Sequence, residues 1–181
     1  MAKPGFLLGR TNPDTDPQGQ AFYEMLELAQ SYFHLAPGTA HKVLGAVDNP
    51  SQVFAETALD SRLQAGQLDA ASAFLSQAVQ LHLPYISLPS AINFGSPARA
   101  KQYAKAGVTL SNGKTVRGVP LVIYATTIGR APSAAAGAFI AYTLSPSGRA
   151  AFASGGYKLL PPRLYGSGGA VPSPVRGALA G

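Results

Sequence analysis

The sequence predicts an α/β fold with a largely parallel sheet from the order of its segments, and its length and cysteine count set further bounds. Short apolar runs alternate along the chain with segments of helical periodicity, which is the pattern of strands joined by helices. The chain has 181 residues, of which 46% are hydrophobic, enough for one medium domain or two small lobes with a core. Cysteine is absent, which excludes disulfides, thiolate nucleophiles and cysteine-based metal sites.

The clearest helix in the sequence follows a loop rich in Pro, Asp and Asn. The run "GFLLG" over 5–9 is typical of a short buried strand, and the loop 11–16 comes after it. The next apolar residues are spaced as on one face of an amphipathic helix: Phe22, Met25, Leu26, Ala29 and Phe33. Because Asp16 is a favoured N-cap and Pro17 a favoured first helical residue, we expect the helix to begin there.

The middle of the chain continues the alternation. We expect a short helix within 39–47 and then a turn with a short extended piece over 48–56. A second amphipathic helix is predicted over Glu56–Ala65, with Gly66 as the residue that ends it. A buried strand over 68–76, a short helix over 77–83 and another strand over 84–89 follow.

The last third of the chain begins with a hairpin. Asn112-Gly113 is a favoured two-residue turn, and the second arm of this hairpin, up to Thr127, is long enough to cross between two sub-structures. Two consecutive helices are then expected. The first is capped by Ser133 or begins at Pro132, and the second begins at Ser145-Pro146 and is closed by Gly155-Gly156.

Composition and motifs exclude several function classes. The formal net charge is +6, but the basic residues form no dense run, so nucleic-acid binding is not favoured, whereas a small anion would suit this diffuse field. His34, His41 and His82 lack metal-ligand spacing. No Gly-x-Ser-x-Gly elbow follows a strand, so we expect no catalytic residues and no enzyme. No segment reaches the length of a membrane span.

Two predicted helix N-termini are candidate anion sites. The first lies at Asp16–Gly19 and the second at Glu56-Thr57, where exposed N–H groups and the positive end of the helix dipole favour negative charge. Gly19 would allow a ligand to approach the first turn closely. Each residue also has a purely local interpretation, with Asp16 as a cap and Glu56 as a first-turn carboxylate.

The order of four segments resembles a known family. They are "GRTNPDTDPQG", "AETALDSRLQAGQLDAASAFLSQAV", "PYISLPSAINFG" and the long run from "VPLVIYATT" to "YKLLPP". Over about residues 5–165 this order is similar to the molybdate/tungstate-binding proteins of ABC importers, in the extracytoplasmic solute-binding superfamily. The resemblance implies a two-lobed periplasmic-binding-protein-like fold of type II, with a mixed sheet flanked by helices, and lacking here an N-terminal first-lobe segment.

The resemblance also implies a division of the chain. Residues 1–7 would be a lead-in and 8–117 the second, oxyanion-binding lobe. Residues 118–165 would form a hinge strand and the C-terminal helices of the first lobe. Independently of the resemblance, the Gly- and Pro-rich composition of segment 166–181 predicts a flexible tail.

The implied ligand is tungstate or molybdate, with no cofactor. By resemblance, the carboxylates of Asp16 and Glu56 would coordinate the Mo or W centre, and the backbone N–H groups of Gln18 and Thr57 would serve the oxo groups. Phe74 stands where many relatives have a tyrosine, and a phenylalanine ring has no hydroxyl to donate.

The family also implies partners and a location. The partners would be the oxyanion, the membrane permease of an ABC importer and the first-lobe segment. The location would be periplasmic or extracytoplasmic, although the N-terminal residues lack a signal peptide, so the chain as given is expected in the cytoplasm. Two alternatives stay open: a receptor for sulfate, phosphate or an organic acid, and a ligand-free or sensor fragment of the same fold.

Overall fold

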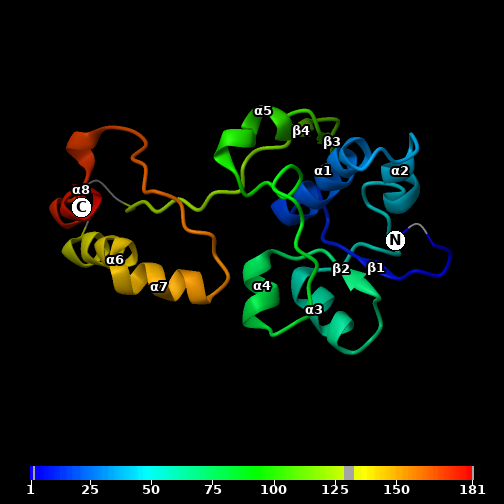
Figure 1. Cartoon of the computed structure of the whole chain (residues 1–181), viewed down its shortest axis with the longest axis horizontal. Coiled ribbons are helices and arrows are strands. Elements are labelled where there is room, and N and C mark those ends of the chain that lie inside the picture. Colours follow the sequence, from blue (N-terminus) through cyan, green and yellow to red (C-terminus); the bar gives the residue numbers. More distant parts are fainter. Residues whose placement is uncertain (2, 129–132, 181) are drawn as a thin grey trace. The chain divides into compact units, whose positions relative to one another are not determined.

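The computed structural model describes residues 1, 3–128 and 133–180, which form two compact units (Figure 1). Unit 1 comprises Met1–Phe74 and Ile86–Val122, and unit 2 comprises Leu75–Tyr85 and Ile123–Gly181. The α/β class is confirmed, because the described part of the chain combines eight helices with short strands. The division into lobes at 8–117 and 118–165 stays a prediction.

The sheet of unit 1 is built on three parallel segments. Strand β1 (Leu8–Gly9) pairs in parallel with β2 (Ala70–Ala71), with Leu8 opposite Ala70. On the other side of β1, Arg10 forms a parallel bridge with Val53. Since successive residues of a strand direct their backbone groups to opposite sides, segment 8–10 lies between 52–54 and 70–72.

Unit 1 contains four helices, three of which lie where the sequence predicted a helix. The four are α1 (Pro17–Tyr32), α2 (Thr39–Leu44), α3 (Glu56–Gln64) and α5 (Ala100–Tyr103), which a 3-10 turn (Pro97–Arg99) precedes. The predictions of α1, α2 and α3 are confirmed. The core of unit 1 gathers around α1, α2 and the segment before α5, with Leu44, Ile92 and Tyr103 fully buried. Figure 1 shows α1 beside α2 and the hairpin strand β3.

The hairpin is confirmed, but its turn differs from the expected one. Strands β3 (Gly107–Thr109) and β4 (Thr115–Arg117) are antiparallel, and the Leu110 N–H donates to the Lys114 carbonyl at 2.9 Å. Three residues therefore form the loop, with Gly113 in the left-handed region at φ 81°. A type I turn followed by a left-handed glycine is the usual geometry of a three-residue hairpin loop.

Unit 2 is helical. It contains α4 (Leu75–Gln80), α6 (Ala134–Leu144), α7 (Pro146–Ser154), a 3-10 turn (Gly168–Ala170) and α8 (Ser173–Ala180), and α6 lies beside α8 in Figure 1. Ser133 caps α6 by accepting the Ala136 N–H, and Ser145 caps α7 by accepting the Gly148 N–H. Both helix starts are confirmed, whereas Pro132, the alternative start, lies outside the described residues.

Besides the hairpin turn, four predictions of local structure were wrong. The strand expected over 68–76 is limited to β2, because α4 already begins at Leu75. Residues 84–89 form no strand, and the long hairpin arm pairs only over Thr115–Arg117. A strand needs a neighbour that pairs with it over several residues. After Arg117 only isolated backbone bonds form, from the Gly118 N–H to the Ala106 carbonyl and from the Leu121 N–H to the Phe94 carbonyl. The tail at 166–181 contains α8 instead of a loose coil, because Val171 and Val175 are buried in unit 2.

No helix in the described ranges combines the length and the apolar character that crossing a bilayer would require.

Glu24, a buried carboxyl on α1, predicts a pH-dependent stability. Burial raises the pKa of this group from its ordinary 4.5 to about 7, and the charge of Glu27 adds to the shift. Because the folded chain then binds a proton that the unfolded chain has released, stability falls as pH rises from 4.5 to about 7. We expect the free energy of unfolding to fall by on the order of 2 kcal/mol across this window.

Urea unfolding between pH 4.5 and pH 8 measures this slope. The isosteric change Glu24→Gln should flatten it, whereas Glu56→Gln, on an exposed residue, should not. An unchanged slope in Glu24→Gln would assign the pH dependence to other groups.

Candidate functional site

The three parallel segments of unit 1 end at one edge of the sheet. Segment 8–10 continues into the loop 11–16 and α1, segment 52–54 continues through Ala55 into α3, and segment 70–72 leads to Phe74. Ligands of open α/β sheets bind outside the carboxyl ends of the strands, so this edge is the candidate site. Five of the six candidate residues follow these segments within the first turn of α1 or α3, and Phe74 directly precedes α4.

Asp16 is the N-cap of α1, as the local interpretation predicts. It has extended backbone angles, and its Oδ1 accepts the Gln18 N–H at 2.8 Å. The Gln18 N–H that the resemblance assigns to an oxo group is therefore occupied by Asp16. The other carboxylate oxygen, Oδ2, has no hydrogen bond to the described residues, so it is the oxygen that remains for a ligand.

Gly19 is required by the protein's own backbone. A Cβ at this position would lie 2.5 Å from the Thr11 carbonyl oxygen and 2.8 Å from the Pro13 nitrogen. Real Cβ contacts are longer, so only glycine allows the loop 11–16 to cross the first turn of α1 this closely. The space that a ligand was expected to use beside Gly19 is thus filled by the loop.

The loop 11–16 is held from several sides. Asn12 accepts the Asp14 N–H at 2.9 Å, and Gln20 donates its side-chain amide to the Pro13 carbonyl at 2.8 Å. Asp14 accepts both the N–H and the hydroxyl of Ser111 in the hairpin loop, at 2.8 and 2.5 Å. These bonds, the hydroxyl first, lower the pKa of the Asp14 carboxyl. The Asp16 cap therefore sits on a preorganised loop.

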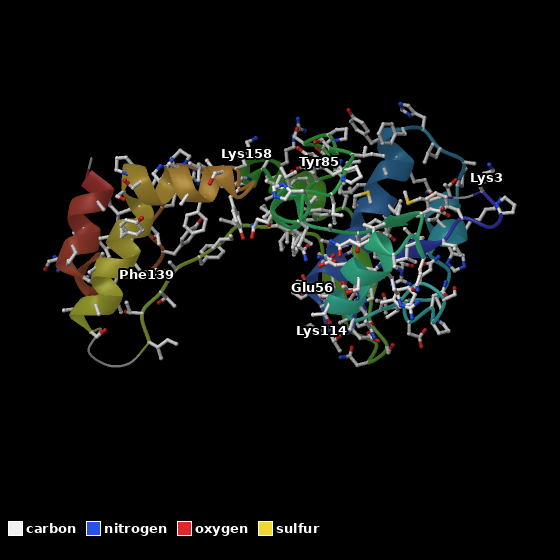
Figure 2. All side chains as sticks on the ribbon, turned by 90° about the horizontal axis from the view of Figure 1, so that it is seen from below. Lys3, Glu56, Tyr85, Lys114, Phe139 and Lys158 are labelled. Carbon is white, nitrogen blue, oxygen red and sulfur yellow. The ribbon has the colours of Figure 1, made fainter. Side chains whose placement is uncertain are left out.

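The second helix start is open to solvent. Glu56 and Thr57 are exposed in the first turn of α3, and the N-cap residue Ala55 makes no side-chain hydrogen bond; Figure 2 labels Glu56. Inside the unit, Leu59 of α3 lies against Gly9, where a Cβ would be only 2.5 Å from Leu59 Cδ1. The contact between α3 and β1 therefore helps to fix where the first turn of α3, which carries Glu56, lies relative to the sheet edge. Phe74 is 37% exposed beside this edge.

Two residues that sequence reasoning did not select organise this edge. Ser72 is buried at the end of β2, and its hydroxyl donates to Gln18 Oε1 at 3.2 Å. Arg10 is fully buried, and its guanidinium donates to the carbonyls of Ala46 and Val47 and to Gln52 Oε1. Burial lowers the pKa of Arg10.

Arg10 had one signal in the sequence, its place directly after the apolar run "GFLLG". The hydrogen bond of Ser72 joins residues 54 positions apart, so it has no local signature.

Other features of the described residues do not compete with this edge. A surface hollow lined by Glu27, Tyr32 and Lys105 lies toward the opposite end of α1. The described ranges contain no group of three His, Cys, Asp or Glu side chains that could hold a metal ion.

This edge, with helices beginning at the carboxyl ends of parallel strands, defines an α/β ligand-binding protein. Residues 1–158 match the family described as bacterial extracellular solute-binding protein, and the chain belongs to that family. The proteins of this family bind solutes outside the cell.

Named relatives extend the comparison. The chain is 40% identical over 119 residues to a protein of Haloferax volcanii provisionally named as an ABC transporter molybdenum-binding protein, covering 66% of this chain and 37% of that protein. It is 28% identical over 198 residues to the molybdate/tungstate-binding protein WtpA of Pyrococcus abyssi, covering 98% of this chain and 57% of WtpA. WtpA of Thermococcus kodakarensis is 27% identical over 198 residues, with 98% and 55% coverage. The chain thus spans between 37% and 57% of the length of these relatives.

Proposed function

We propose that this chain belongs to the solute-binding component of an ABC importer and binds tungstate or molybdate at the carboxyl edge of unit 1. The observation that carries the proposal is the pair of helix starts after adjacent parallel segments, one with Asp16 and one with Glu56. Relatives named as molybdate/tungstate-binding support the choice of ligand. The protein would act outside the cytoplasm, without enzymatic activity, and deliver its ligand to a membrane permease.

Both carboxylates, of Asp16 and of Glu56, can take part in binding a metal oxyanion. A carboxylate repels an oxyanion, but it is a hard oxygen ligand that can coordinate a high-valent metal centre directly. Asp16 Oδ2 and the exposed Glu56 carboxylate would bind the Mo or W centre. The Thr57 N–H and the dipole of α3 would stabilise an oxo group, and Phe74 would contribute an apolar wall.

We also propose that a first-lobe segment, corresponding to the part of the relatives that this chain does not span, completes the site. The apolar helix α6 of unit 2 exposes Phe139 and Tyr142 at 67% and 58% (Figure 2 labels Phe139). Large apolar side chains exposed together are typical of surfaces that another polypeptide covers.

Isothermal titration with tungstate, molybdate, sulfate and phosphate tests the proposal. We expect tungstate or molybdate to bind more tightly than sulfate, and Glu56→Gln to weaken tungstate binding by about 10- to 100-fold, because it removes an anionic ligand of the metal centre. The matched control is Asp60→Asn, which removes a carboxylate from the same helix, and it should leave affinity unchanged.

Other outcomes decide between the remaining functions. If sulfate or phosphate binds and neither Asp16→Asn nor Glu56→Gln changes the affinity, the chain is a receptor for another small anion. If no oxyanion binds even after the first lobe is supplied, the binding proposal is wrong and a ligand-free or sensor role remains.

A further inference from the structure

The first turn of α1 is tied to the end of β2 by a buried hydrogen bond that links two distant parts of the chain. The Ser72 hydroxyl donates to Gln18 Oε1 at 3.2 Å, and the two residues are 5% and 4% exposed. The Ser72 N–H donates to the Gly9 carbonyl at 3.0 Å, which holds this serine in the sheet. Because water does not reach this pair, loss of either partner leaves a buried polar group without its bond.

The same residue, Gln18, also holds the Asp16 carboxylate. Its backbone N–H donates to Asp16 Oδ1 at 2.8 Å, so the orientation of Asp16 depends on where the first turn of α1 lies. The loop 11–16 supports this turn on one side, through the close approach to Gly19. The Gln18 side chain supports it on the side of β2.

We propose that Gln18 is a positioning residue whose side chain, bound to Ser72, fixes the first turn of α1 and thereby aims the Asp16 carboxylate at the ligand. The two parts of this inference have different support. The statement that Asp16 is directed at a ligand rests on the proposed function, whereas the fixed position of the first turn rests on the hydrogen bond alone. In this role Gln18 touches no ligand. Its side chain instead fixes the position of the Asp16 carboxylate, which does contact the ligand, relative to the end of β2.

A double-mutant cycle separates positioning from a general loss of structure. Gln18→Leu and Ser72→Ala should each weaken tungstate binding by about 10-fold in the full chain, since both break the same bond. Ser72→Thr, which keeps the hydroxyl, should restore most of the affinity. In an Asp16→Asn background, Gln18→Leu should cause no further loss, because the carboxylate that it positions has been replaced. An equal loss in both backgrounds would overturn the inference.

Hydrogen exchange tests the structural role of the Ser72–Gln18 hydrogen bond without any ligand. The amides of Gln18 and Gln20, which bond to Asp16 in the first turn, should exchange about 10-fold faster in Ser72→Ala, whereas the Phe33 amide at the end of α1 should not change. If the unsubstituted chain binds no tungstate, the proposed function fails. Hydrogen exchange alone then decides whether the Ser72–Gln18 bond fixes the first turn of α1. Unchanged exchange at Gln18 and Gln20 would overturn it.

Discussion

Replacing Arg10 with leucine is expected to lower the free energy of unfolding by about 3 kcal/mol, because the change leaves three hydrogen-bond acceptors without their donor. The guanidinium donates to the Ala46 carbonyl at 2.8 Å, to the Val47 carbonyl at 2.9 Å and to Gln52 Oε1 at 3.1 Å. These bonds attach the segment 46–52 to β1 immediately before α3 begins. Leucine fills part of the volume but satisfies none of the acceptors.

Urea unfolding followed by circular dichroism measures this loss. The matched control is Arg62→Leu, which removes an exposed guanidinium that lies 4.7 Å from the Phe54 ring centre and donates to Gln67. This control should cost less than about 1 kcal/mol. Equal effects of the two substitutions would mean that burial of Arg10 contributes nothing to stability. Because Arg10 anchors the approach to α3, Arg10→Leu should also weaken any binding that depends on Glu56.

Replacing Gly19 with alanine should cost about 3 kcal/mol, although alanine is the better helix former. The added Cβ would lie 2.5 Å from the Thr11 carbonyl oxygen, and backbone atoms cannot move aside as a flexible side chain can. Either the loop 11–16 or the first turn of α1 must therefore shift. Both movements would displace Asp16.

The control for Gly19→Ala is Gly177→Ala in α8, where a Cβ would have no atom within 4 Å. That substitution should leave stability unchanged or raise it by up to about 1 kcal/mol. The two variants are compared by thermal unfolding. A stable Gly19→Ala protein with unchanged amide exchange in the first turn of α1 would show that the loop tolerates a side chain there.

Helix starts were the most predictable part of this chain. Asp16 with Pro17, Ser133, and Ser145 with Pro146 are local signals, because an N-cap side chain bonds to a backbone N–H only two or three residues away. The candidate residue Asp16 was found for the same reason, whereas Glu56 was found through the apolar spacing that predicts α3, whose N-cap residue Ala55 makes no side-chain bond. Their use as metal-centre ligands stays a prediction.

The failed strand predictions have a common physical cause. A strand exists only if a partner accepts its backbone hydrogen bonds, and no local pattern in 84–89 or after Arg117 reports whether that partner is present. The missed helix α8 has the opposite cause. Its Gly- and Pro-rich composition suggested a coil, but burial of Val171 and Val175 in unit 2 stabilises it.

The sequence by itself determined the α/β class, the starts of α1, α2, α3, α6 and α7, and the two carboxylates at the starts of α1 and α3, because helix signals depend on neighbours within a few residues. Only the tertiary structure decided what surrounds Asp16. The Gln18 N–H binds that carboxylate, the loop fills the space beside Gly19, and Ser72 reaches Gln18 from 54 residues away. Such contacts arise from the parallel pairing of distant segments, which brings together residues whose spacing along the chain carries no periodic signal.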